Sequence, residues 1–150
     1  MRSVALIALA LALTLATSAH AETVSISMWR WKNITLRLEA QAERRTFLLE
    51  KMPPDYAKSE GIQPGAIFWD GTRQGDQLVG EAYLYGTGCK PVAFAMSGSA
   101  KLNAKGEVTL HATPPERKPG SCETIQVDTF AAVPFVFKLI SKPGTFKDDE

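Results

Sequence analysis

The sequence predicts an all-β protein, a small antiparallel β-barrel or sandwich of about seven or eight strands after an N-terminal signal helix. Short apolar runs alternate with polar residues one by one, which is typical of half-buried strands. All 11 glycines and all 9 prolines fall after residue 21, where they separate these runs as turn residues do. A third observation, the pair of cysteines Cys89 and Cys122, is typical of small exported domains.

The first 21 residues have the three-part layout of a signal peptide. Arg2 supplies the positive charge, residues 4–16 are apolar, and Thr17–Ala21 end in Ala-x-Ala, which predicts cleavage before Glu22. As a helix the apolar run spans about 20 Å, less than the roughly 30 Å core of a bilayer. We therefore expect a mature chain without a transmembrane segment, located in the periplasm or secreted.

The composition of the mature chain excludes several classes of partner. One of the 17 basic residues, Arg2, lies in the predicted leader, which leaves 16 basic residues against 16 acidic ones. A chain without net positive charge is not expected to bind nucleic acid. His111 is the single histidine after the leader, and the acidic residues do not follow the spacing of a calcium loop. We therefore expect no metal and no other cofactor.

The first predicted strands are Val24–Met28, Ile34–Glu39 and Thr46–Lys51, because apolar residues alternate with polar ones in the first two and form a short run in the third. The segment Leu38–Met52 is also rich in good helix formers, so a helix is an alternative there. Its apolar residues do not keep a helical spacing, which favours strands. Residues 52–64 contain two adjacent prolines and a Gly and are predicted to form a loop.

The central strands are more clearly marked. Ala66–Trp69 is a compact apolar strand, after which Asp70-Gly71 is predicted to open a turn that continues through Gly75-Asp76. Leu78–Tyr85 is the next strand. One of its faces carries Leu78, Gly80, Ala82 and Leu84, and the other carries Val79, Glu81, Tyr83 and Tyr85.

The remaining strands follow the same pattern. Alternation predicts strands over residues 92–97 and 107–113, and an apolar run with Phe135 and Phe137 predicts a last strand over Val133–Ile140. A charged loop rich in proline separates them at residues 114–120. We expect one β domain over residues 22–141, followed by a disordered polar tail over residues 142–150.

An even number of cysteines in an exported chain predicts a disulfide between Cys89 and Cys122. Such a bond would join the end of the Leu78–Tyr85 strand region to the loop before the last strand. It would close a loop of 34 residues and stabilise the fold by roughly 3–4 kcal/mol. The alternatives are two free thiols or a redox pair, although a redox pair normally has the Cys-x-x-Cys spacing.

The spacing of the glycines and cysteines resembles that of known proteins. The run Gly61–Gly71 leads to Gly75-Asp76 and then to Gly80-Glu81-Ala82-Tyr83, with one cysteine after it and one before a closing aromatic strand. Over residues 46–137 this pattern resembles a group of small secreted proteins of unknown function from alphaproteobacteria. The resemblance implies export, a β-rich fold and one disulfide, and it transfers no catalytic residue.

Few residues suit catalysis. His111 is the one possible histidine base, with Ser97 or Ser99 as nucleophile, but Gly98-Ser99-Ala100 is not a nucleophile elbow. A paired-carboxylate hydrolase would use two of Asp70, Asp76 and Glu81. Both aspartates adjoin glycines and suit turns, which weakens this hypothesis.

The aromatic residues make the better functional case. Tyr83 and Tyr85 beside Glu81 suit a surface that stacks on sugars or anchors a protein partner. Trp29 and Trp31 share one side of an extended segment, with Arg30 and Lys32 on the other side, which suits an acidic glycan, lipid headgroups or a protein. The alternative for all four aromatic residues is that they fill the core of a small barrel.

These observations favour a non-catalytic binding or accessory protein of the bacterial cell envelope, whose ligand is a glycan or a protein partner. The predicted binding residues are Trp29, Trp31, Glu81, Tyr83 and Tyr85. The alternatives are a small hydrolase acting on envelope polysaccharide through its surface carboxylates and a purely structural component of the envelope.

Overall fold

A computed structural model describes residues 23–126 and 132–145 of the chain, the last four of them by backbone alone. The predicted signal peptide over residues 1–21 lies outside the described residues, as do residues 146–150 of the predicted tail. No helix within the described ranges is both long and apolar enough to cross a membrane.

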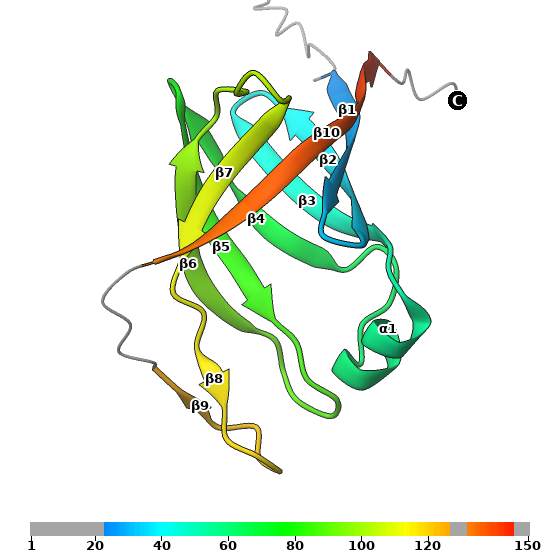
Figure 1. Cartoon of the computed structure of the whole chain (residues 1–150), viewed down its shortest axis with the longest axis vertical. Helices are drawn as coiled ribbons and strands as arrows, with labels where there is room; N and C mark the ends of the chain where they lie inside the picture. The colour runs from blue at the N-terminus through cyan, green and yellow to red at the C-terminus, as the bar shows by residue number, and fades with distance from the viewer. Residues whose placement is uncertain (1–22, 127–131, 146–150) are drawn as a thin grey trace, which may run out of the picture.

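Eight antiparallel strands close into a barrel, which confirms the predicted all-β fold and selects the barrel over the sandwich (Figure 1). Around the barrel the order is β1-β10-β7-β6-β5-β4-β3-β2, so most neighbours in space are also neighbours along the chain. The strands are β1 (Val24–Trp31), β2 (Ile34–Gln41), β3 (Arg44–Lys51), β4 (Ile67–Gln74), β5 (Gln77–Leu84), β6 (Val92–Ser99), β7 (Glu107–Ala112) and β10 (Val133–Thr145).

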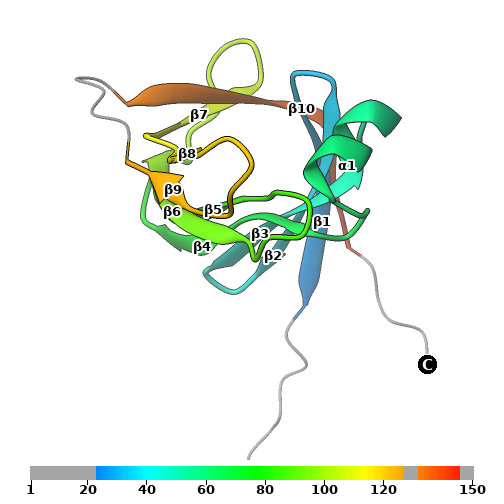
Figure 2. The same ribbon diagram turned by 90° about the horizontal axis from the view of Figure 1, so that it is seen from below.

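Two small elements lie at the same end of the barrel, the lower end in Figure 1, and both are seen from below in Figure 2. One is the helix α1 (Pro54–Glu60), and the other is a hairpin of β8 (Glu116–Arg117) and β9 (Thr124–Ile125). The opposite end carries the β2–β3 and β4–β5 turns and the loop between β6 and β7.

The helix α1 corrects the predicted loop over residues 52–64. Pro54 stands in its first turn, where the missing N–H of proline costs nothing, and Asp55 favours the helix dipole there. Gly61 ends the helix in the left-handed conformation at φ 63°. The prolines and the glycine that suggested a loop are therefore the boundaries of a short helix, which buries none of its residues.

The other local predictions have mixed outcomes. Residues 38–51 form strands rather than a helix, as the lack of helical spacing favours, with a turn at Ala42-Glu43 between β2 and β3, and Met52 follows the end of β3. The predicted turn at Asp70-Gly71 is wrong, because β4 continues through both residues and turns at Gly75-Asp76. The last strand, β10, runs to Thr145 and so includes the first four residues of the predicted tail.

The interior of the barrel is filled by side chains. Phe47 and Phe137 stack at its centre with ring centroids 5.0 Å apart, and both are almost fully buried. The Trp69 indole is also fully buried, and its Nε1 donates a hydrogen bond of 2.9 Å to the carbonyl of Met96. Large side chains with satisfied polar atoms therefore hold the eight strands together.

The predicted disulfide between Cys89 and Cys122 is present, with Cα atoms 5.4 Å apart. It joins the β5–β6 loop to the β8–β9 hairpin. Arg117 of β8 links the same two segments, because its guanidinium donates hydrogen bonds to the carbonyls of Cys122 and Lys90 at 2.8 and 3.1 Å. One covalent bond and one guanidinium thus fix the hairpin beside the barrel.

Candidate functional site

Trp29, one of the predicted binding residues, belongs to the core. It is 7% exposed, and its ring meets Phe47 edge to face at 5.9 Å between centroids. Its Nε1 donates a hydrogen bond of 2.8 Å to the hydroxyl of buried Ser27 on the same face of β1. For this residue the structure supports the core-filling alternative.

Trp31 shares the inward side of β1 with Trp29, as predicted, but lies nearer the end of the barrel that carries α1. Its ring packs against Phe135 at 5.4 Å and against Phe68 at 5.1 Å, and it stays partly exposed. The ammonium of Lys32 lies 4.9 Å from its ring centroid, a cation–π contact. Trp31 therefore contacts both the aromatic core and a cationic side chain.

The predicted set on β5 is divided between two environments. Glu81 is exposed and Tyr83 half-buried on the outer wall of the barrel. Tyr85 was expected to face outward with them, but it packs against the core, and its hydroxyl donates a hydrogen bond of 2.5 Å to the carbonyl of Ile67. Burial, and then the neighbouring Tyr83, raise the pKa of Tyr85. The five predicted residues thus do not form one surface.

The pairing of strands β10, β1, β2 and β3 creates a different feature, a row of cationic side chains on the outer wall. Lys138 lies opposite Arg30, Arg30 opposite Thr35, and Thr35 opposite Lys51. We call these four residues the cationic row. Its three charged side chains are exposed and come from segments far apart in the sequence. A one-residue irregularity between β2 and β3 at Thr35 places Lys51 beside Thr35.

A shallow groove of about 510 Å³ follows most of this row and ends at the β1–β2 turn. Its cations are Arg30, Lys32 and Lys51, and no acidic residue is among the residues that line it, which also include Asn33, Thr35, Met52, Pro53 and Pro54. Among the described residues, none of the ion pairs involves a member of the cationic row. The charges of the groove are therefore available to an anion.

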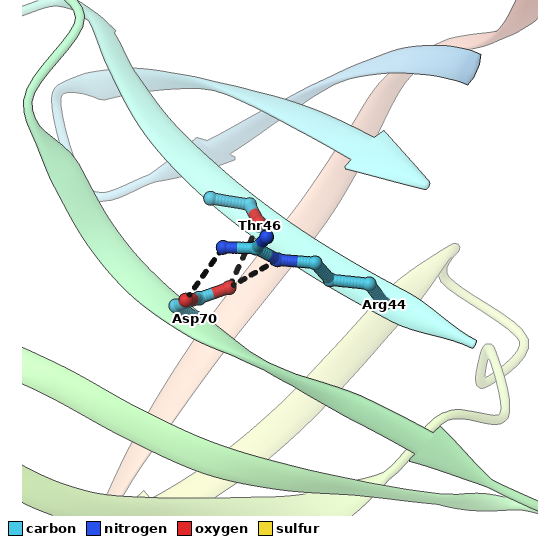
Figure 3. Close-up of polar contacts among 3 residues, drawn as sticks. All are labelled: Arg44, Thr46 and Asp70. Carbon is cyan, nitrogen blue, oxygen red and sulfur yellow. Dashed lines mark hydrogen bonds and ion pairs between the residues drawn. The ribbon is translucent and has the colours of Figure 1, made fainter. Parts of the chain in front are cut away.

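Asp70 and Glu81, two carboxylates of the hydrolase hypothesis, are not arranged as in an enzyme active site. Asp70 lies opposite Glu81 on β4 and β5, but both stand on the outer wall of the barrel. The Asp70 carboxylate is occupied, because it accepts hydrogen bonds from Arg44 at 3.1 and 3.3 Å and from the Thr46 hydroxyl at 2.9 Å (Figure 3). The hydrogen bond to Asp70 and its negative charge raise the pKa of Arg44.

The third carboxylate, Asp76, lies in the β4–β5 turn, where it pairs with Lys101 at 3.2 Å. It therefore does not join Asp70 and Glu81. The described part of the chain also contains no cluster of three metal-binding side chains.

The structure places the serine and the histidine of the hydrolase hypothesis side by side but provides no group that orients the histidine. Ser97 lies directly opposite His111 on β6 and β7, and both are exposed. No hydrogen bond joins the two side chains among those of the described residues. The outward cross-strand partners beyond them are Val79 and Pro134, neither of which can orient a histidine.

Sequence reasoning paired Arg30 with Lys32 but missed Lys51 and Lys138. These two are isolated charges in the sequence, and only the register of the strands brings them beside Arg30. Comparison with family models, with curated proteins and with solved structures finds no match. The resemblance to secreted alphaproteobacterial proteins stays a prediction.

Proposed function

We propose that this chain is an exported, non-catalytic binding protein of the bacterial cell envelope that binds an acidic glycan in the groove beside the cationic row. The observation that carries the proposal is the direct pairing of like charges, Arg30 opposite Lys138, in a row with Lys51. The groove along that row contains three cations and no acid among its lining residues.

Like charges placed directly opposite each other across strands destabilise a sheet. Lys138 also lies opposite Glu107 on its other side, in β7, so a carboxylate offsets part of its charge, whereas the cross-strand partners of Arg30 are Lys138 and Thr35. A polyanion bound along the row would offset the repulsion between Arg30 and Lys138. The formal charge of the whole chain is only +1, so the row is not part of a generally basic surface. Such a face favours a specific anionic ligand over general adhesion to polyanions.

The dimensions of the row suit a polymer. Neighbouring strands lie about 4.8 Å apart, so the three steps from β10 to β3 span roughly 14 Å. A glycan with a carboxylate on successive sugars offers repeated charges over that distance. Lys32 lines the groove and lies over the ring of Trp31, so a partly exposed aromatic ring is close to the end of the groove, and aromatic rings stack on sugars.

The test is binding of polygalacturonate, with neutral dextran as the control polymer, by protein expressed from the full-length sequence. Arg30→Gln combined with Lys51→Gln is expected to weaken binding by about tenfold or more, because each cation contributes a charge-assisted contact. Lys90→Gln with Lys105→Gln removes two exposed charges elsewhere and should leave the affinity unchanged. Equal losses in the two double variants, or equal binding of dextran, would overturn the proposal.

The alternative of a hydrolase acting through Asp70, Asp76 or Glu81 is examined with the same polymer. If the protein shortens the polymer and Glu81→Gln abolishes this activity, the hydrolase alternative is established. The arrangement of these residues gives it less support, because the carboxylates stand on the outer wall and Asp70 already binds Arg44 and Thr46. A protein partner or a structural role in the envelope would instead appear as constant co-purification of one protein, lost with Arg30→Gln.

A further inference from the structure

The end of the barrel opposite α1 holds a pocket of about 190 Å³ that the proposed glycan groove does not involve. Its apolar lining includes Trp29, Leu78 and Val108. Leu102 in the β6–β7 loop also lines it and is 49% exposed, so apolar surface at this pocket is left in water. Pockets for drug-sized ligands have volumes of about 300–1,000 Å³, so the occupant of this one must be small.

Two arginines line the opening of this pocket, which we call its mouth. Arg45 lies two residues before buried Phe47 on β3, and Arg73 lies two residues after Gly71 on β4, so both are on the inward-facing side of their strands. Arg45 is paired with Gly71, which makes Arg73 its diagonal neighbour across the two strands. Both side chains line the pocket, and no acidic residue does.

Both guanidinium groups have N–H donors that form no hydrogen bond among the described residues. Arg45 uses its Nη1 on the carbonyls of Ala42 and Arg44, at 2.7 and 2.8 Å, and Arg73 uses its Nε on the carbonyl of Gly75 at 2.9 Å. Among the described residues, no hydrogen bond involves Nε or Nη2 of Arg45. An arginine carries five N–H donors, so several remain available at the mouth.

Among the described residues, Asp76 is the one carboxylate that forms an ion pair with either arginine, and it does not neutralise both. Asp76 is 4.0 Å from Arg73 and closer, at 3.2 Å, to Lys101. Arg73 and Lys101 therefore share one carboxylate, and Arg45 is a further cation beside Arg73. Burial, and then the charge of Arg73, lower the pKa of Arg45, as expected for two cations held side by side.

We propose that this pocket binds a small amphipathic carboxylate, such as a medium-chain fatty acid. The chain lies on Trp29, Leu78 and Val108, and the carboxylate lies between Arg45 and Arg73. Guanidinium groups match the planar carboxylate geometrically, and two of them at the rim of an apolar pocket favour an anion with an apolar tail. The charged head of the ligand thus lies at the two arginines and its apolar tail on the apolar lining, which matches the arrangement of the pocket.

Calorimetric titration of the protein with octanoate tests the assignment. Octanol and acetate serve as ligands that lack the head and the tail, respectively. Octanoate is expected to bind at least about tenfold more tightly than either, because octanol leaves the guanidiniums unpaired and acetate leaves the pocket empty. No binding of octanoate, or equal binding of octanol or acetate, would overturn the proposal.

Matched variants locate the site. Arg45→Gln should weaken octanoate binding by about tenfold, since it removes a charge-assisted contact. Arg44→Gln changes the adjacent residue, whose side chain faces the outer wall and binds Asp70, and should not change the affinity. Leu102→Ser tests the loop without touching the core and should also weaken binding. If Arg44→Gln matches Arg45→Gln, or if both leave binding unchanged, the carboxylate does not lie where we place it.

Discussion

Gly71 of β4 lies directly opposite Gly80 of β5, and the indole of Trp69 occupies the space that side chains at both positions would need. A Cβ atom on Gly80 would lie 2.3 Å from the carbonyl oxygen of Asp70 and 2.8 Å from the Trp69 ring. Two glycines thus let the largest side chain of the core lie flat against the backbone of two strands.

Gly80→Ala is therefore expected to lower the free energy of unfolding by about 1–3 kcal/mol, the usual cost of overpacking a filled core. Urea denaturation monitored by tryptophan fluorescence measures the loss. Ser97→Ala, on the exposed face of the neighbouring β6, is the control and should change stability by less than about 0.5 kcal/mol. An unchanged midpoint for Gly80→Ala would show that the indole has room to move.

Trp29→Ala is expected to lower the free energy of unfolding by about 3–5 kcal/mol, because this buried ring would leave a cavity. Trp31→Ala should cost less, since that ring is partly exposed at the end of the barrel. Denaturant titration of the two variants decides the point. Equal losses would contradict the placement of Trp31, and a small loss for Trp29→Ala would contradict its burial.

Tyr85→Phe is expected to lower stability by about 1 kcal/mol at neutral pH, because the carbonyl of Ile67 loses its hydrogen bond from the hydroxyl. Tyr83→Phe should have little effect there, since no hydrogen bond of the Tyr83 hydroxyl is found among the described residues.

Tyr85 also predicts how stability changes in alkali. The unfolded tyrosine has a pKa of about 10, and burial raises the folded value above it. The contribution of this group is thus complete below about pH 10 and declines as the pH rises toward the higher folded pKa. Tyr85→Phe should reduce this alkaline slope without abolishing it, because burial also raises the pKa of Tyr56. Melting curves across the alkaline range measure the slope, and an identical slope in the variant would contradict the prediction.

Replacing both cysteines, Cys89→Ala with Cys122→Ala, is expected to destabilise the protein by about 3 kcal/mol and to lower its Tm by roughly 10 °C. The hairpin should stay in place below that temperature, because Arg117 still bonds to both segments. Calorimetry measures the first effect, and proteolysis of the β8–β9 hairpin measures the second. Adding Arg117→Gln should release the hairpin, and a hairpin already cleaved in the cysteine variant would mean that Arg117 does not hold it.

Much of the fold could be predicted because alternation is a local property. It identified most of the strands and placed Trp29 and Trp31 on the same side of β1. The turn at Asp70-Gly71 was misplaced because a glycine in a strand looks like a glycine in a turn, and the Trp69 indole that requires it is a tertiary contact. Helix α1 was missed because it buries no residue and so leaves no apolar periodicity.

The candidate sites were harder to predict. Arg30 and Lys138 are 108 positions apart and become neighbours only through the pairing of β1 with β10. Arg45 and Arg73 likewise meet only through the β3–β4 register. Charge on one strand can be read from the sequence, whereas charge across strands depends on register, which alternation alone leaves open.

The pairing of β1 with β10 has a consequence for how the chain matures. Ser25 lies opposite Thr145, so the barrel closes only between its first and last strands, while the strands from β1 to β7 can assemble hairpin by hairpin. A nascent chain that lacks β10 has two open edges, β1 and β7, whose unpaired backbone groups can recruit another chain. The pairing of the last strand with both edges is therefore the step that covers these exposed backbone groups.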